Sequence, residues 1–177
     1  SQNITWTRTG SFTNVKLEYS TNAFANELQT TVITASTLAA PLTYAWTVPD
    51  AIGTNLKVRI SDADDASVAS ESASPFMVKP LLAVTRPVGG ENWIVGQSEN
   101  ILWNYKGSNT VNVRIHYYRD GAFRGEIADT TTNDGSFAWT VPNDLQTSPN
   151  LDIRIFSLPT TDPWAVTAVS SGLFQII

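Results

Sequence analysis

A short phrase occurs twice in this chain and constrains its fold more than any other feature. Residues 137–145 read FAWTVPNDL, and residues 44–52 read YAWTVPDAI, so Ala-Trp-Thr-Val-Pro is identical in both. The match extends through four further pairs of segments: 1–11 and 98–108, 14–20 and 112–118, 55–61 and 150–156, and 69–78 and 167–176. Self-similarity at a fixed spacing is the signature of a repeated module. The sequence therefore predicts two copies of one domain, residues 1–78 and 79–177.

The matched segments alternate apolar and polar residues, a pattern typical of strands with one buried face. Turn signals separate them, such as Asp120-Gly121, and Pro49 and Pro142 each end a segment because proline cannot donate to a ladder. No segment has a helical period. The predicted fold is all-β, with two tandem antiparallel sandwiches of the immunoglobulin or fibronectin-III kind. Four tryptophans recur at matched inward positions and are predicted to be structural core: Trp6, Trp46, Trp103 and Trp139.

Composition narrows the classes of function. The hydrophobic fraction of 42% and the charged fraction of 15% are typical of a folded protein. The net charge of −5 disfavours a nucleic-acid partner, which rewards clustered Lys and Arg. No apolar run is long enough for direct membrane insertion. The absence of cysteine excludes disulfides and thiolate sites but does not identify a compartment.

Copy two contains the motifs RPVGGENWIVGQSENILW, VNVRIHYY, GSFAWTVP and LDIRI, and it ends in SSGLFQI. In these motifs the chain resembles the Ser-Thr-rich GPI-anchored cell-wall domain, which is related to yeast proteins implicated in β-1,6-glucan assembly. Similar modules recur in tandem in long bacterial and archaeal surface proteins. The resemblance covers essentially all of copy two and most of copy one. It implies an immunoglobulin-like sandwich outside the cell, and it transfers no catalytic residues.

The residues that could carry catalysis are few, and we expect no enzyme. The only histidine, His116, lies on the polar side of its segment, and the matching residue in copy one is Glu18. A catalytic base needs a nucleophile and an orienting acid beside it. Glycoside hydrolysis requires two acids across a cleft. The acids here lie in turns and on outward faces, and no pair recurs in both copies.

One acidic loop is a weak candidate for Ca²⁺, and otherwise no cofactor is expected. Asp62, Asp64 and Asp65 lie within the segment SDADDAS, and calcium takes six to eight oxygen ligands. The spacing is not that of an EF-hand, and the matching segment of copy two keeps only Asp162. A solvated turn is the favoured interpretation.

Three aromatic residues of copy two replace small residues of copy one. Tyr118 matches Ser20, Phe156 matches Ser61, and Trp164 matches Ala66. Strand parity directs Tyr118 and Phe156 away from the core. Aromatic side chains that converge on a surface indicate a contact with protein or sugar. We therefore predict that Tyr118, Phe156 and Trp164 form a contact surface.

These observations favour a structural or adhesive repeat unit of an extracellular cell-surface protein, fibre or layer. Its partners would be further copies of itself or another surface protein. The alternative is a carbohydrate-binding module of a cell-wall or extracellular protein, with a glycan as the partner. A binding module predicts aromatics in one groove of a single domain, and a structural unit predicts them against another protein chain.

Copy one is predicted to lack its first strand. Copy two begins with LLAVTRPVGGENWIVGQ, residues 81–97, before SENILW, whereas copy one begins directly at SQNITW. A sandwich without an edge strand exposes unpaired backbone groups and a strip of core. Two explanations are open: the chain is cut from a longer array, which we favour, or another chain supplies the strand. We expect a groove beside Ile4 and Trp6 that is either open or filled by a segment of another chain.

Overall fold

The computed structural model describes residues 1–143, 145 and 147–177. The chain divides into two compact units, Ser1–Val78 and Lys79–Ile177. Nearly all regular structure is β, apart from a 3-10 turn, η1 (Glu27–Gln29). The all-β class predicted from the alternating segments is confirmed. No helix in the described part of the chain has the length and apolar character needed to span a membrane.

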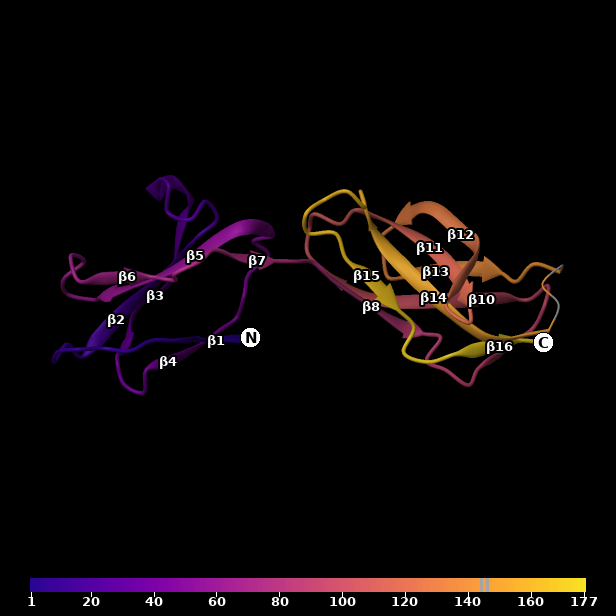
Figure 1. Cartoon of the computed structure of the whole chain (residues 1–177), viewed down its shortest axis with the longest axis horizontal. Helices are drawn as coiled ribbons and strands as arrows, with labels where there is room; N and C mark the ends of the chain where they lie inside the picture. The colour runs from indigo at the N-terminus through magenta and orange to yellow at the C-terminus, as the bar shows by residue number, and fades with distance from the viewer. Residues whose placement is uncertain (144, 146) are drawn as a thin grey trace. The chain divides into compact units, whose positions relative to one another are not determined.

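Unit 1 is built from a small sheet and a larger one (Figure 1). The small sheet pairs β1 (Gln2–Thr5) with β4 (Thr43–Trp46). The larger sheet has the order β3-β2-β5-β6, with β7 also paired to β5. Its strands are β2 (Asn14–Ser20), β3 (Thr30–Leu38), β5 (Gly53–Asp62), β6 (Ala69–Glu71) and β7 (Phe76–Val78). All these pairings are antiparallel.

Unit 2 repeats this plan with additional strands. Its smaller sheet has the order β13-β10-β8, formed by β8 (Leu81–Arg86), β10 (Ser98–Lys106) and β13 (Ser136–Thr140). Its larger sheet has the order β12-β11-β14-β16-β9, with β15 paired to β14. These strands are β9 (Asn92–Trp93), β11 (Asn112–Arg119), β12 (Ala122–Thr132), β14 (Ser148–Leu158), β15 (Thr167–Val169) and β16 (Phe174–Ile176).

The core of unit 2 is formed by inward side chains of both sheets. The smaller sheet contributes Trp103 and Trp139, and the larger sheet contributes Ile115, Ile153 and Phe174, among others. Trp93 of β9 is 1% exposed and packs between Trp139 and Phe174, with ring centroids 6.0 Å and 4.5 Å away. Both sheets therefore bury their facing sides against each other, as a sandwich requires.

Each unit contains a tyrosine–tryptophan pair at matching positions of its own core. Tyr117 and Trp139 in unit 2 have ring centroids 5.6 Å apart, and Tyr19 and Trp46 in unit 1 are 5.4 Å apart. Trp46, Trp103 and Trp139 are all buried, as expected of core residues. Trp6 departs from the prediction, because it is only half-buried. Its indole N–H donates to the carbonyl oxygen of Ala39 at 3.1 Å.

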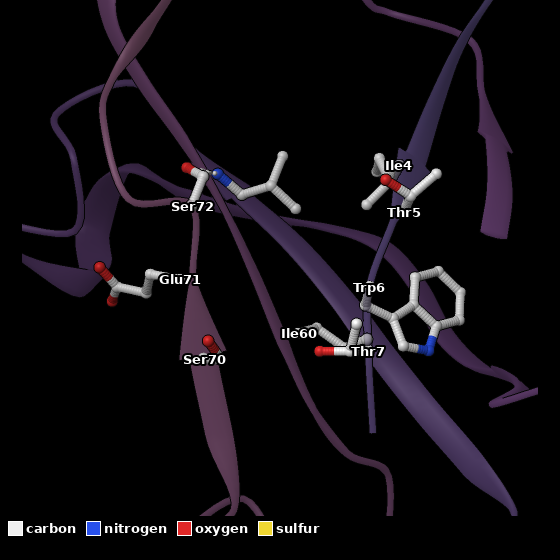
Figure 2. A pocket seen from close by; sticks show the side chains of 9 residues that line it. Ile4, Thr5, Trp6, Thr7, Ile60, Ser70, Glu71 and Ser72 are labelled. Atoms are coloured by element: carbon white, nitrogen blue, oxygen red, sulfur yellow. Dashed lines mark hydrogen bonds between the residues drawn. The ribbon is translucent and has the colours of Figure 1, made fainter. Parts of the chain in front are cut away.

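The exposure of Trp6 follows from a missing strand. In unit 2, β10 pairs with β13 on one edge and with β8 on the other, and Val84 of β8 lies opposite Trp103. In unit 1, the corresponding strand β1 pairs only with β4 among the described residues. Within residues 1–78, unit 1 therefore has no counterpart of β8, as the sequence predicts, and Trp6 lacks the cover that Trp103 has. Trp6 lines a pocket there (Figure 2).

We expect Trp139→Ala to destabilise unit 2 by about 3–5 kcal/mol, since truncating a large buried aromatic leaves a cavity. Hydrogen exchange of the whole chain in moderate denaturant measures this: amides of β10, β11 and β13 should exchange faster, and amides of β2 and β5 should not change. Trp164→Ala is the matched control, because Trp164 is only half-buried. Equal protection of unit 2 in both variants would contradict the core assignment of Trp139.

Candidate functional site

The outer face of the larger sheet of unit 2 carries a cluster of aromatic side chains. Strand pairing places His116 opposite Arg154 and Glu126, and Tyr118 opposite Asp152 and Phe123. Residues 114, 116 and 118 of β11 point to one face, because side chains alternate along a strand. That face is opposite to the one that buries Val113 and Ile115 in the core.

The rings gather around His116. The ring centroid of His116 lies 5.0 Å from that of Phe123, 5.1 Å from Phe156 and 6.4 Å from Tyr118. Tyr118 and Phe123 are 5.7 Å apart in an edge-to-face arrangement. Phe123 is 55% exposed, while Tyr118 and Phe156 are half-buried. We call Tyr118, Phe123 and Phe156, with His116 between them, the aromatic surface.

Charged groups lie at one side of the aromatic surface. The guanidinium carbon of Arg154 lies 3.8 Å from the ring centroid of Tyr118, a cation–π contact. Arg154 Nε also donates to Asp152 Oδ2 at 2.9 Å, which holds the guanidinium in place. One face of the Tyr118 ring is therefore already occupied by the protein itself.

Some polar atoms beneath the aromatic surface are buried without hydrogen-bond partners among the described residues. They are both ring nitrogens of His116 and Oδ1 of Asp152. His116 Nε2 is 3.5 Å from Glu126 Oε2, longer than a good hydrogen bond. Unpaired buried polar atoms lower stability.

The structure brings together part of the predicted contact surface. Tyr118 and Phe156 converge, with His116 between them. Trp164 lies half-buried in the loop after β14 and makes no ring contact with them within the described ranges. Phe123 belongs to the cluster and was not predicted. Its signal was the Asp120-Gly121 hairpin, which folds residue 123 back beside residue 118.

Unit 1 covers the same face with its own chain. Ser20, the counterpart of Tyr118, is 0% exposed. Its hydroxyl donates to Asn22 Oδ1 and accepts from the backbone N–H of Phe24. Arg59, the counterpart of Arg154, lies 4.4 Å from the ring centroid of Phe24 and donates to both carboxylate oxygens of Glu27. In unit 1, the segment between β2 and β3 therefore covers this face. In unit 2, the tight hairpin between β11 and β12 leaves the matching face open.

The acidic loop has its carboxylates engaged in turns. Asp62 Oδ1 accepts from the backbone N–H of Asp64 at 3.0 Å, and Asp65 Oδ1 accepts from the N–H and the hydroxyl of Ser67. These bonds from Ser67 lower the pKa of Asp65. In the described part of the chain, no three acidic or histidine side chains come close enough to hold a metal ion. Asp62, Asp64 and Asp65 stay a weak candidate for Ca²⁺, with a solvated turn as the favoured interpretation.

No family model matches the chain, and no curated protein matches it. Solved structures with some likeness include fibronectin(III)-like modules of Clostridium thermocellum CbhA, at 14% identity and a TM-score of 0.35, covering 54% of this chain and 94% of that one. Dpr11 IG1 bound to DIP-gamma is another, at 11% identity and TM-score 0.32, with 92% and 83% covered. A titin Z1Z2 tandem has 15% identity and TM-score 0.34, with 96% and 87% covered.

The Glu27–Arg59 pair of unit 1 predicts an acid response. Arg59 lowers the pKa of Glu27, mainly through its hydrogen bonds. Because the pKa is lower in the folded state, the pair stabilises unit 1 above the ordinary pKa of a glutamate, and this contribution disappears as the pH falls through the folded value. We expect Glu27→Gln to reduce the acid-induced fall in the melting temperature of unit 1, measured by calorimetry. If the melting temperature of unit 1 fell identically with pH in the unaltered chain and in Glu27→Gln, the Glu27–Arg59 pair would not contribute to stability.

The three aromatic residues of unit 2 that replace small residues of unit 1 give a further prediction. Replacing Tyr118, Phe156 and Trp164 by the residues of unit 1, Ser, Ser and Ala, should lower the stability of unit 2 by about 1 kcal/mol, as is typical of substitutions outside a core. Calorimetry of the whole chain checks this, with Ile115→Ser as a matched core substitution. A loss as large as that of Ile115→Ser would show that the three side chains serve folding.

Proposed function

We propose that this chain is a structural and adhesive repeat unit of an extracellular surface protein, and that it works through protein–protein contacts. The observation that carries the proposal is the aromatic surface. It is displayed by unit 2 and replaced in unit 1 by a closed face, although the inward positions of the two units match. Function in such a pair resides in what the outer faces display.

The chemistry of the aromatic surface fits a protein partner. Tyrosine, phenylalanine and arginine are enriched at protein interfaces, and large rigid rings contribute contact area at low cost in side-chain entropy. Phe123 is the most exposed of the three rings, with half-buried Tyr118 and Phe156 beside it. We infer self-association as the contact, with another surface protein as the second possible partner.

The extracellular location is supported by the resemblance to cell-wall domains and by the tandem arrangement, which is common in surface proteins. An enzymatic function has little support. His116 is enclosed by rings and has Glu126 as its nearest acid, with no serine or cysteine nucleophile in hydrogen-bond contact among the described residues.

Carbohydrate binding is the second candidate, because exposed rings beside an arginine and an aspartate also bind sugars. A sugar stacks on a free ring face, and one face of Tyr118 is taken by Arg154. This contact favours the protein partner over the glycan.

Sedimentation velocity over a range of concentrations tests the proposal. The unaltered chain should associate, and the variant Tyr118→Ser/Phe123→Ser/Phe156→Ser should not. The matched control removes exposed apolar groups elsewhere on unit 2, at Ile94, Val111 and Leu173, which are 51%, 64% and 53% exposed, and should still associate. A chain that stays monomeric and instead binds glycans through the same aromatic residues would favour the carbohydrate-binding function.

A further inference from the structure

The edge strand β3 of unit 1 carries no charge. It lies at the end of the larger sheet and is paired only with β2 in the described part of the chain. Its sequence, TTVITASTL, includes no charged residue, no proline and no glycine, and no charged residue occurs between Glu27 and Asp50. Threonine, valine and isoleucine favour strands. Unit 1 therefore has a regular edge strand without the charged side chains that normally protect such an edge.

The matching strand of unit 2 carries such charges. β12 also lies at the end of its larger sheet, and Arg124, Glu126 and Asp129 lie along it. Unit 2 contains the strand β8 that unit 1 lacks, so the end position belongs to the fold of both units and does not arise from the missing strand. Charged side chains on an edge oppose pairing with another chain. The edge is thus protected in unit 2 and unprotected in unit 1.

The backbone N–H and C=O groups of Thr30 and Val32 point to the free edge of β3. Across the ladder between β2 and β3, the N–H of Thr21 donates to the carbonyl oxygen of Gln29 at 3.3 Å, so Gln29 belongs to a hydrogen-bonded pair. In an antiparallel ladder such pairs alternate with pairs whose backbone groups point outward. The ladder continues in unbroken register as far as Val32, so Thr31 bonds to β2 while Thr30 and Val32 do not.

Exposed apolar side chains accompany these backbone groups. Val32 is 49% exposed, and Leu28, which precedes the strand in η1, is 96% exposed. Val32 lies opposite Glu18 on the outer face of the sheet, because the neighbouring Leu17 points into the core. A strand that pairs with this edge removes both the backbone groups and the apolar side chains from water.

We propose that two copies of this chain pair through their β3 strands, antiparallel about a two-fold axis at Thr31, so that the larger sheet of unit 1 continues from one copy into the other. Thr30 of each copy then lies opposite Val32 of the other, and each such pair exchanges both backbone hydrogen bonds. The proposal deepens the proposed function, on which it rests, by naming a second contact between copies.

A second copy is the partner that the neutrality of β3 favours. A charged strand finds no opposite charge on β3 to bind. An uncharged strand meets its own copy without repulsion, and a two-fold contact requires a surface that is complementary to itself. Thr30 and Val32 meet this requirement, because their outward backbone groups lie symmetrically about Thr31.

The contact through β3 is the weaker of the two contacts between copies. One strand pair is a small interface, and small interfaces are weak on their own. We therefore expect the pairing of β3 at millimolar protein, above the concentrations of sedimentation velocity. In an assembly that the aromatic surface already holds together, the effective concentration of β3 reaches this range. The contact thus extends an assembly that the aromatic surface begins.

Amide exchange with water, measured by NMR on the full chain from micromolar to millimolar concentration, tests the proposal. The chain carries Tyr118→Ser/Phe123→Ser/Phe156→Ser, so that the aromatic surface is absent. The N–H groups of Thr30 and Val32 should exchange about tenfold more slowly at millimolar than at micromolar concentration, because pairing protects them. The N–H groups of β12 should not change.

Substitutions added to this chain identify the partner strand. Val32→Lys should abolish the slowing, because the side chains at position 32 are diagonal neighbours across the pair and like charges repel. Val68→Lys is the matched control and should keep the slowing, since Val68 is 48% exposed and lies between β5 and β6. Val32→Glu alone should also abolish it, and an equal mixture of the Val32→Lys and Val32→Glu chains should recover it.

Three results would overturn the proposal: exchange that does not depend on concentration, equal behaviour of Val32→Lys and Val68→Lys, or a mixture that recovers nothing. Because the aromatic surface is absent from every chain in this titration, the result does not depend on that surface. Failure of the proposed function is measured separately, by an unaltered chain that stays monomeric in sedimentation velocity.

Discussion

The pairing of β8 with β10 closes the sandwich of unit 2, and the rest of its core depends on it. It satisfies the second edge of β10 and places Leu82 and Val84 over the larger sheet. Edge strands with free backbone groups invite further pairing, so a unit without this strand has both an open ladder and an open core. Unit 1 keeps the same inward residues as unit 2 at Ile4 and Trp6 but leaves them half-buried.

The outer faces of the two units have diverged more freely than the inner ones, for a physical reason. Inward side chains must fill a closed volume, so Trp46 and Trp139 keep matching aromatic partners in Tyr19 and Tyr117. Outward side chains meet no such constraint. One ladder position holds Glu18 bonded to Arg59 in unit 1, and the same position holds His116 among aromatic rings in unit 2.

Sequence reasoning predicted well what periodicity and internal repetition determine. The strands, the buried Trp46, Trp103 and Trp139, and the missing first strand all followed from aligning the two copies. It predicted poorly what turns and insertions determine. Phe123 joins the cluster through a tight hairpin with register shifts between β11 and β12, and Trp164 depends on the path of a loop. The connection between β2 and β3 is longer than the matching hairpin of unit 2. Its length can be counted in the sequence, but residue types do not predict that it folds over Ser20.

The aromatic surface of unit 2 and the matching face of unit 1 differ in what they display. The aromatic surface acts through side chains, so its specificity depends on shape and ring contacts, and a few substitutions alter it. In unit 1 the same face is closed, because Arg59 lies over Phe24 and donates to Glu18 and Glu27. These groups bond to one another, so the closed face displays fewer rings than the aromatic surface does. Because the two faces lie on separate compact units, a substitution in the aromatic surface leaves the closed face of unit 1 intact.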